Sequence, residues 1–329
     1  MKAVATSPMR MARAQAAGGP DVLRVDVVER PAIGPEDVLV AVRLAGVNFA
    51  DVNARRGTYA AVTGPRGLGR DILGEVVAVG DRVEGGALRV GLRVAGFSST
   101  PAYAEFAVAH HTLVWPVPDA VSDEQAAAFP TVGQTAYHLM RRAGGLRTGE
   151  SVLVTAAAGG VGSVAVPLAT LLGAGRVVAA AGDVERARTA GAPEAVAYPD
   201  LASVDPVDLV LDGVGGGVRD GAVARLAPFG RLVHFGNSAA TTETLPAPRA
   251  LRERCLGVVG FHLDVLRRND RPALAAAAEL LMGWLAAGRL HIPVHAVLPL
   301  DRAAEAHRLL ESRQVRGKVL LAVGSPGGP

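Results

Sequence analysis

The pattern with the most specific chemistry is a run of small residues between an expected strand at 151–157 and an expected helix at 163–173. The run contains Gly159, Gly160, Val161 and Gly162. Small residues let the backbone turn sharply and approach a pyrophosphate closely, and the start of the helix presents unpaired N–H groups to an anion. Because the run lies between a strand and a helix and a second strand follows, it predicts a dinucleotide site. The alternative is a tight turn without a ligand.

The end of the next strand, expected at 176–182, distinguishes between the two nicotinamide cofactors. Folds that prefer NAD place Asp or Glu about 20 residues after the glycines, where the carboxylate holds the ribose hydroxyls. That position is Ala181 here, and Asp183 is expected to cap the next helix instead. Arg186 could bind a 2′-phosphate in a bidentate manner, although it could also be a solvated surface arginine. The pattern favours NADPH.

Two kinds of domain must position these residues. Up to residue 121, short β-rich runs alternate with Gly, Pro and Asp, which predicts a compact β-barrel-like domain. From Ser122, which has Gln125 at capping-box spacing, strands and helices alternate and predict a parallel, doubly wound sheet of the α/β class. The expected strands are 37–47, 73–80, 91–97 and 102–110 in the first domain and 151–157, 176–182, 194–198, 207–215 and 231–237 in the sheet, with a helix at 218–230 and a final strand at 318–323.

The composition excludes several classes of protein. The 329 residues exceed the usual size of one domain, the formal net charge is only +3, and no basic run marks a nucleic-acid surface. Lysine is scarce beside arginine, which we ascribe to a GC-rich coding sequence. The single cysteine, Cys255, excludes an internal disulfide and a Cys-rich zinc site. No stretch resembles a signal peptide, and the apolar helix at 272–290 is expected to pack in a core rather than in a membrane, so we expect a soluble cytoplasmic protein.

Further motifs occur in one order along the chain. They are G-V-N-F-x-D at 46–51, TAAAGGVGSVAV at 155–166, LDGVG at 211–215, VHFGNSA at 233–239 and LESRQVRGKVLL at 310–321. With these motifs the chain resembles the zinc-free, zeta-crystallin-like quinone oxidoreductases of the medium-chain dehydrogenase/reductase superfamily, over about residues 2–323. The resemblance implies a GroES-like β-barrel catalytic domain at 1–121, a Rossmann NADPH-binding domain at 122–262 and a return to the catalytic domain at 263–329. It also implies a homodimer.

The resemblance carries site residues over one at a time. Asn48 and Asp51 correspond to residues that line the nicotinamide and substrate cleft, although Asp51 could equally be a structural cap. Tyr59 is a candidate proton donor, with solvent as the alternative. The implied cofactor residues are Asn48 and Thr135, the loop residues Gly159, Gly160 and Val161, the 2′-phosphate group Gly182, Arg186, Tyr198 and Arg313, and the strand end Phe235, Gly236 and Asn237.

The chain departs from the family pattern at a few positions. Asn53 stands where the family usually has Tyr, and Pro167 stands where a helix usually has Gln, which should disturb that helix. Zinc-dependent relatives have a His-Glu pair where this chain has Arg70 and Asp71, so we expect no metal.

These observations predict hydride transfer from NADPH to an electron-poor acceptor. Alcohol oxidation lacks an evident Lewis acid in this sequence, whereas a quinone or a conjugated carbonyl needs less help from the protein. One alternative is an enoyl reductase acting on a specialised biosynthetic or lipid-derived enone. The other is an NADPH-binding protein whose redox activity has lapsed.

Overall fold

The structure is a computed structural model that describes residues 7–58, 64–84, 86, 88–188, 191–241 and 245–324. It divides into two compact units, of which the first consists of Met1–Thr131 with Asn269–Pro329 and the second of Val132–Arg268. Both changes of unit lie later in the chain than the predicted domain boundaries after residues 121 and 262. The return of the chain to its first unit makes the first unit discontinuous in sequence.

The first unit is built from two sheets whose strands are antiparallel, except that β15 lies parallel to β16. Its larger sheet has the order β15-β16-β3-β5-β6-β8, with β7 also pairing with β3, and a smaller sheet has the order β2-β1-β4. The strands are β1 (Pro8–Ala14), β2 (Leu23–Glu29), β3 (Asp37–Val47), β4 (Arg66–Gly67), β5 (Asp71–Val79), β6 (Arg93–Phe97), β7 (Phe106–His110), β8 (Val114–Pro116), β15 (Val294–Pro299) and β16 (Lys318–Ala322). The helices are α1 (Phe49–Arg56), α8 (Arg271–Ala286) and α9 (Ala303–Glu311), while α2 (Asp123–His138) runs across the change of unit.

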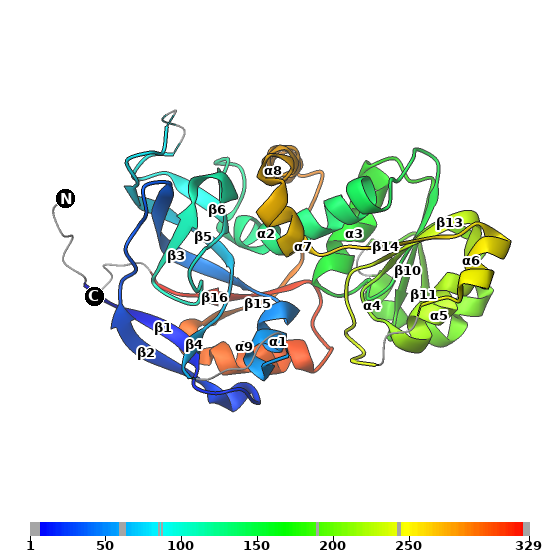
Figure 1. Cartoon of the computed structure of the whole chain (residues 1–329), viewed down its shortest axis with the longest axis horizontal. Coiled ribbons are helices and arrows are strands. Elements are labelled where there is room, and N and C mark those ends of the chain that lie inside the picture. The colour runs from blue at the N-terminus through cyan, green and yellow to red at the C-terminus, as the bar shows by residue number, and fades with distance from the viewer. Residues whose placement is uncertain are drawn as a thin grey trace. The chain divides into compact units, whose positions relative to one another are not determined.

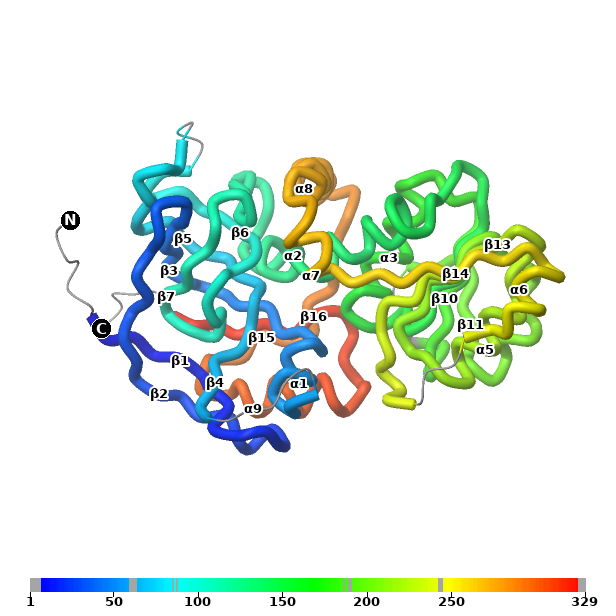
Figure 2. Tube along the Cα trace, viewed as in Figure 1, coloured from blue at the N-terminus to red at the C-terminus, as the bar shows by residue number. Residues whose placement is uncertain are grey.

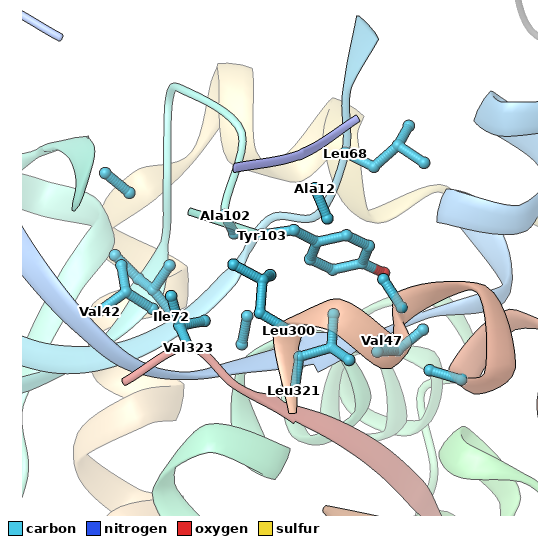
Figure 3. Packing of buried hydrophobic residues seen from close by; sticks show 14 of the residues in the cluster. Ala12, Val42, Val47, Leu68, Ile72, Ala102, Tyr103, Leu300, Leu321 and Val323 are labelled. Atoms are coloured by element: carbon cyan, nitrogen blue, oxygen red, sulfur yellow. The ribbon is translucent and has the colours of Figure 1, made fainter. Parts of the chain in front are cut away.

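Strand β3 organises this unit because it pairs with three other strands. It lies antiparallel to β5, β7 and β16, and nearly all of its residues are buried. One core cluster beside it consists mainly of Val, Ala and Leu side chains and includes the fully buried ring of Tyr103. Figure 3 shows the ring of Tyr103 within this cluster, beside Ala12. The predicted β-rich first domain is therefore confirmed.

The C-terminal segment completes the sheet of the first unit. Residues of β16 pair with β3 in the register Val319 to Val47, and the red end of the chain lies beside the blue strands in Figure 2. This pairing places Lys318, the first residue of β16, next to the point where β3 ends and α1 begins.

The second unit is a parallel sheet of the order β11-β10-β9-β12-β13-β14. Helices α3 to α6 each pack against strands of this sheet (Figure 1). The order reverses direction between β9 and β12, which is where doubly wound folds bind their ligands. The elements are β9 (Ser151–Val154), α3 (Gly160–Leu171), β10 (Arg176–Ala181), α4 (Val184–Arg188), β11 (Glu194–Ala197), β12 (Val207–Asp212), α5 (Gly216–Ala224), β13 (Leu226–His234), α6 (Pro248–Arg254), β14 (Gly257–Gly260) and α7 (Leu263–Asn269).

Three details differ from the sequence predictions. The helix predicted at 218–230 is wrong after residue 224, because β13 begins at Leu226. Helix α3 runs without a break through Pro167, which was expected to disturb it. Ser122 does accept a bond from the Gln125 N–H, but the Gln125 side chain pairs with the backbone of Ile292 instead of closing the capping box.

Along the described ranges, no helix is both long enough and apolar enough to cross a membrane. The apolar helix expected at 272–290 corresponds to α8, whose buried residues recur along one face.

Gly74 in β5 is a position where the sheet leaves no room for a side chain. A Cβ there would lie 2.0 Å from the carbonyl oxygen of Ala41 on β3. We expect Gly74→Ala to destabilise the first unit by about 2–3 kcal/mol, because the strand backbone must shift. Thermal unfolding followed by tryptophan fluorescence measures this unit alone, since Trp115 and Trp284 both belong to it.

Gly283 provides a matched control in the same unit. It is exposed inside α8, and a Cβ there would meet nothing within 4 Å. We expect Gly283→Ala to stabilise the unit by up to about 1 kcal/mol. Equal effects of the two substitutions would contradict the packing argument.

Candidate functional site

Asn48 lies at the junction of β3 and α1, where the chain leaves the sheet. Its backbone is extended and it is the N-cap residue of α1, where Asn48 and Asp51 form a capping box. The side-chain oxygen Oδ1 accepts a hydrogen bond from Lys318 Nζ at 2.6 Å, and the nitrogen Nδ2 donates to Asp71 Oδ2 at 2.9 Å. Two partners from two other strands therefore hold this partly buried amide.

Lys318 and Asp71 form a buried ion pair beneath Asn48. The distance from Lys318 Nζ to Asp71 Oδ2 is 3.2 Å, and the two side chains are 2% and 0% exposed. Lys318 also donates to the carbonyl oxygen of Val47 at 3.1 Å, and Asp71 Oδ1 accepts from the Thr131 hydroxyl at 2.5 Å. Buried charges are stable only when paired and hydrogen-bonded, and both conditions hold here.

Asp51 is part of a second buried network in the same unit. Its Oδ2 accepts from the Asn48 backbone N–H at 2.9 Å, which caps the start of α1, and from the Tyr103 hydroxyl at 2.9 Å. Asp51 is only 6% exposed, and burial raises its pKa to about 6. Burial also raises the pKa of Tyr103 well above its ordinary value. Of the two roles predicted for Asp51, this geometry supports the structural cap.

His307 on α9 extends this network and fixes its direction. Its Nδ1 lies 3.5 Å from Arg55 Nη1 and its Nε2 lies 3.3 Å from the Tyr103 hydroxyl. A guanidinium group can only donate, so Nδ1 accepts and Nε2 carries the proton of a neutral ring. Burial, together with the nearby Arg55 charge, lowers the pKa of His307 to about 3. Arg55 in turn forms an ion pair with Glu311.

In the second unit, the glycine-rich loop has the features that were predicted for phosphate binding. Gly159 is the extended N-cap residue of α3, and no side chain caps this helix end. The backbone approach is so close that a Cβ at Gly162 would lie 2.2 Å from the carbonyl oxygen of Ala156. The N–H groups of Gly160 and Val161 therefore begin a helix for which no side chain among the described residues acts as a cap.

Strand β10 carries no acidic side chain, and the aspartate that follows it serves the next helix. Strand β10 ends at Ala181, and Asp183 Oδ1 accepts from the Glu185 N–H at 3.0 Å, so Asp183 caps α4 as expected. Gly182 lies beside Tyr198, whose hydroxyl accepts from the Ala156 N–H at 3.3 Å. The structure thus brings Tyr198 to the start of the glycine-rich loop. Arg186 lies on α4, and its side chain is outside the described atoms.

Asp212 holds the ends of β9 and β12 together, and sequence reasoning did not single it out. It is fully buried and accepts from the Thr155 hydroxyl at 3.0 Å and from the N–H groups of Val214 and Gly215 at 3.1 and 3.2 Å. His234 Nδ1 lies 3.1 Å from its Oδ2. This carboxylate shapes the LDGVG turn at the switch point of the sheet.

The strand end predicted to pass the nicotinamide packs closely on that turn. Phe235 donates its N–H to the carbonyl oxygen of Asp212 at 3.0 Å, and a Cβ on Gly213 would lie 2.8 Å from the Phe235 ring. The Asn237 side chain donates to the Thr241 carbonyl at 2.7 Å and accepts from the Thr241 N–H at 3.3 Å. Gly236 links Phe235 and Asn237 in the sequence.

The remaining predicted residues are distributed over both units. Thr135 is buried in the part of α2 that belongs to the second unit. Arg313 belongs to the first unit, where it follows α9 in a left-handed conformation. Tyr59 lies outside the described residues, and Asn53 is partly buried in α1. In the ranges that the structure covers, no three His, Cys, Asp or Glu side chains gather as a metal site requires.

Comparison with known proteins gives the family. The family model of the alcohol dehydrogenase GroES-like domain matches residues 34–119, and that of the zinc-binding dehydrogenases matches residues 172–321. A quinone oxidoreductase of Pseudomonas aeruginosa is 33% identical over 322 residues, which are 92% of this chain and 96% of the relative. The chain belongs to the quinone oxidoreductase family. The predicted GroES-like and Rossmann folds are thereby confirmed.

Solved structures agree with this membership of the quinone oxidoreductase family. A mycobacterial protein complexed with NADPH is 31% identical, with a TM-score of 0.87, over 96% of this chain and 100% of that chain. The Escherichia coli quinone oxidoreductase complexed with NADPH is 30% identical, with a TM-score of 0.84, over 95% and 100%. The chain is also 30% identical over 320 residues to a phenolphthiocerol/phthiocerol polyketide synthase protein of Mycobacterium tuberculosis, 93% of this chain but 14% of that protein.

Sequence reasoning missed the residues that hold the predicted site of this quinone oxidoreductase family member. Asp71 was noted only as a replacement for a zinc-site residue, and Lys318 only as part of a C-terminal motif. One signal was present, because of the 34 lysines and arginines only Lys2 and Lys318 are lysines. A lysine kept within an arginine-rich chain indicates a need for a compact ammonium group.

The burial of Asp51 predicts a pH-dependent stability. Its carboxyl ionises near pH 4 when unfolded and near pH 6 when folded, so ionisation costs the folded state about 3 kcal/mol between these values. Both hydrogen bonds to Asp51 are accepted by one oxygen, Oδ2, so the amide oxygen of Asp51→Asn can still accept them. We expect the variant to gain about 2–2.5 kcal/mol of unfolding free energy relative to the parent as the pH rises from 4 to 7.5, measured by urea unfolding.

Asp301→Asn is the control for this measurement. Asp301 pairs with Arg10 on the surface of the same unit and is 62% exposed. Its difference from the parent should stay within about 0.5 kcal/mol over the same pH range. A constant difference for Asp51→Asn would show that Asp51 titrates as it does in the unfolded chain.

Proposed function

We propose that this protein is an NADPH-dependent reductase that transfers hydride to a quinone or to another acceptor with a conjugated carbonyl. The observation that carries the proposal is the start of α3, a helix end that no side chain caps and whose first turn has room only for glycine at position 162. Such a helix end binds phosphate through its free N–H groups. The NADPH complexes of two neighbouring structures support the same cofactor for this chain.

The residues of the second unit fit this cofactor. The N–H groups of Gly160 and Val161 would hold the pyrophosphate, and Gly159 would let it approach. Because β10 ends at Ala181 without a carboxylate, a 2′-phosphate meets no like charge there. The other residues proposed to border the cofactor are Gly182, Arg186 and Tyr198 at the 2′-phosphate, with Arg313, and Thr135, Phe235, Gly236, Asn237 and Asn48 toward the nicotinamide.

When bound, NADPH supplies the hydride, and the residues of this chain orient the reactants and exclude competing geometries. Asn48 is the proposed contact to the acceptor, because its amide is held in place and remains partly exposed. Asp51 supports Asn48 through the cap of α1 and has no role on the acceptor in this proposal. The proton for the reduced acceptor would come from solvent or from Tyr59.

An enoyl reductase is the second candidate function. It is favoured by the similarity to one part of a polyketide synthase and by Asn53, which replaces the usual family tyrosine. Both functions use the same hydride chemistry and differ in the acceptor. The homodimer also stays a prediction, which light scattering at several protein concentrations would test.

The test of the proposed function is NADPH oxidation, with NADH in parallel, against a panel of quinones and conjugated enones. We expect turnover with NADPH that exceeds turnover with NADH, and quinones to be the better acceptors. A response to enones alone would favour the enoyl reductase. Tight NADPH binding without turnover on any acceptor would indicate lapsed redox activity.

Arg186 offers a sharper test of cofactor choice. If it binds the 2′-phosphate, Arg186→Gln should raise the Kd for NADPH about 10- to 100-fold and leave the Kd for NADH unchanged. Arg188→Gln is the matched control, because Arg188 lies on the same short helix and pairs with Glu185 on the surface. Fluorescence titration measures both affinities. Equal losses for NADPH and NADH would contradict the assignment of Arg186.

A further inference from the structure

The Asn48 amide is oriented by two partners of opposite hydrogen-bonding type. An ammonium group only donates, so the Asn48 atom that faces Lys318 must be the oxygen. An ionised carboxylate only accepts, so the atom that faces Asp71 must be the nitrogen. The orientation of this amide therefore follows from the chemistry of its neighbours.

This orientation determines what Asn48 offers to a bound molecule. The oxygen is engaged by Lys318, and one N–H of the amide nitrogen is engaged by Asp71. The second N–H has no partner among the residues that the structure describes, and Asn48 is partly exposed. Asn48 therefore presents a hydrogen-bond donor.

The two positioning groups are themselves immobilised. Each of the three donors of Lys318 has an acceptor, namely Asn48, Asp71 and Val47. Gly46 leaves room for the carboxylate, because a Cβ there would lie 2.9 Å from Asp71 Oδ2. A planar guanidinium could not direct three donors from one atom in this way, which explains a lysine in an arginine-rich chain.

We propose that Lys318 and Asp71 are positioning residues that hold the Asn48 amide with its second N–H available to the carbonyl oxygen of the acceptor. This inference rests on the proposed function. In the reaction, a carbon of the acceptor gains the hydride and the electron pair of its carbonyl moves onto the oxygen. The oxygen accepts the Asn48 hydrogen bond and then takes a proton from water. The two electrons come from NADPH, which leaves as NADP⁺.

A donor aimed at the oxygen stabilises the charge that develops there. Such a donor is more valuable in the transition state than in the ground state, so its loss should lower kcat rather than raise KM. Lys318 also withdraws electron density from the amide through its oxygen, which strengthens the remaining N–H as a donor.

A double-mutant cycle tests this inference. Asn48→Ala and Lys318→Met should each lower kcat on the order of 100-fold, the effect of removing one oxyanion donor. The double variant should be no slower than Asn48→Ala alone, because Lys318 acts through Asn48. The Kd for NADPH, measured by fluorescence, should change much less than kcat in each variant. Additive losses, or a raised Kd with an unchanged kcat, would overturn the proposal.

Two further variants distinguish a loss of positioning from a folding defect. Lys318→Met leaves Asp71 buried without its charge partner, so Lys318→Met with Asp71→Asn keeps the site neutral and should retain the thermal unfolding midpoint while staying slow. Lys318→Arg keeps the charge and should not restore kcat, because the geometry differs. Full activity of either variant would contradict the proposed role.

A spectroscopic measurement separates this inference from the proposed function. The chain has four asparagines, Asn48, Asn53, Asn237 and Asn269, so selective ¹⁵N-asparagine labelling gives few side-chain NH₂ signals. In the parent, the Asn48 N–H bonded to Asp71 should exchange more slowly than the second N–H, and this difference should be smaller in Lys318→Met. Unchanged exchange would overturn the positioning role even in an active enzyme. If the parent reduces no acceptor, the proposed function fails and the catalytic use of the N–H fails with it, whereas protected exchange would still support the orientation.

Discussion

The buried contact between Lys318 and Asp71 is the constraint on which the first unit depends. An ammonium and a carboxylate that are almost wholly removed from water must satisfy each other and their remaining hydrogen-bonding capacity, or the fold is penalised by several kcal/mol. Strands β16 and β5 meet this demand by flanking β3, so that both charges reach the residue where β3 ends. The ion pair forms only in this register of the three strands, and the same ion pair orients Asn48.

The second unit uses a buried carboxylate in a comparable way. Asp212 gathers a hydroxyl and two backbone N–H groups at the switch point of the parallel sheet, so the loops there have a defined shape before any ligand binds. Polar groups that are buried and fully partnered give rigidity as well as stability. In each unit, therefore, a buried carboxylate supports the residues that we propose to contact the cofactor or the acceptor. These carboxylates, Asp71 and Asp212, are not themselves proposed to contact either molecule.

The sequence predicted the elements whose pattern is local. The strand at 37–47 was predicted correctly, and the glycine-rich run at 159–162 opens a helix as predicted, although that helix begins at Gly160 rather than at 163, because alternation, glycine spacing and flanking elements all lie within a few residues. The helix predicted beyond Ala224 failed because Leu226 pairs with Val207 of β12, so the chain is already extended there, and Pro228 also disfavours a continued helix. Asp71 and Lys318 could not be paired from the sequence, since 247 residues separate them and only the strand pairing brings them together.

The pairing of β16 with β3 also has a consequence for how the protein is made. A ribosome synthesises Lys318 only after the entire second unit has been translated, so the first unit has no ion pair for Asp71 until then. Domains fold as units during synthesis, and the second unit is contiguous in sequence. The parallel sheet can therefore be complete before β3 has gained its pairing with β16. A nascent chain that stalls before residue 318 would expose the unpaired edge at the end of β3 to chaperones or to other chains.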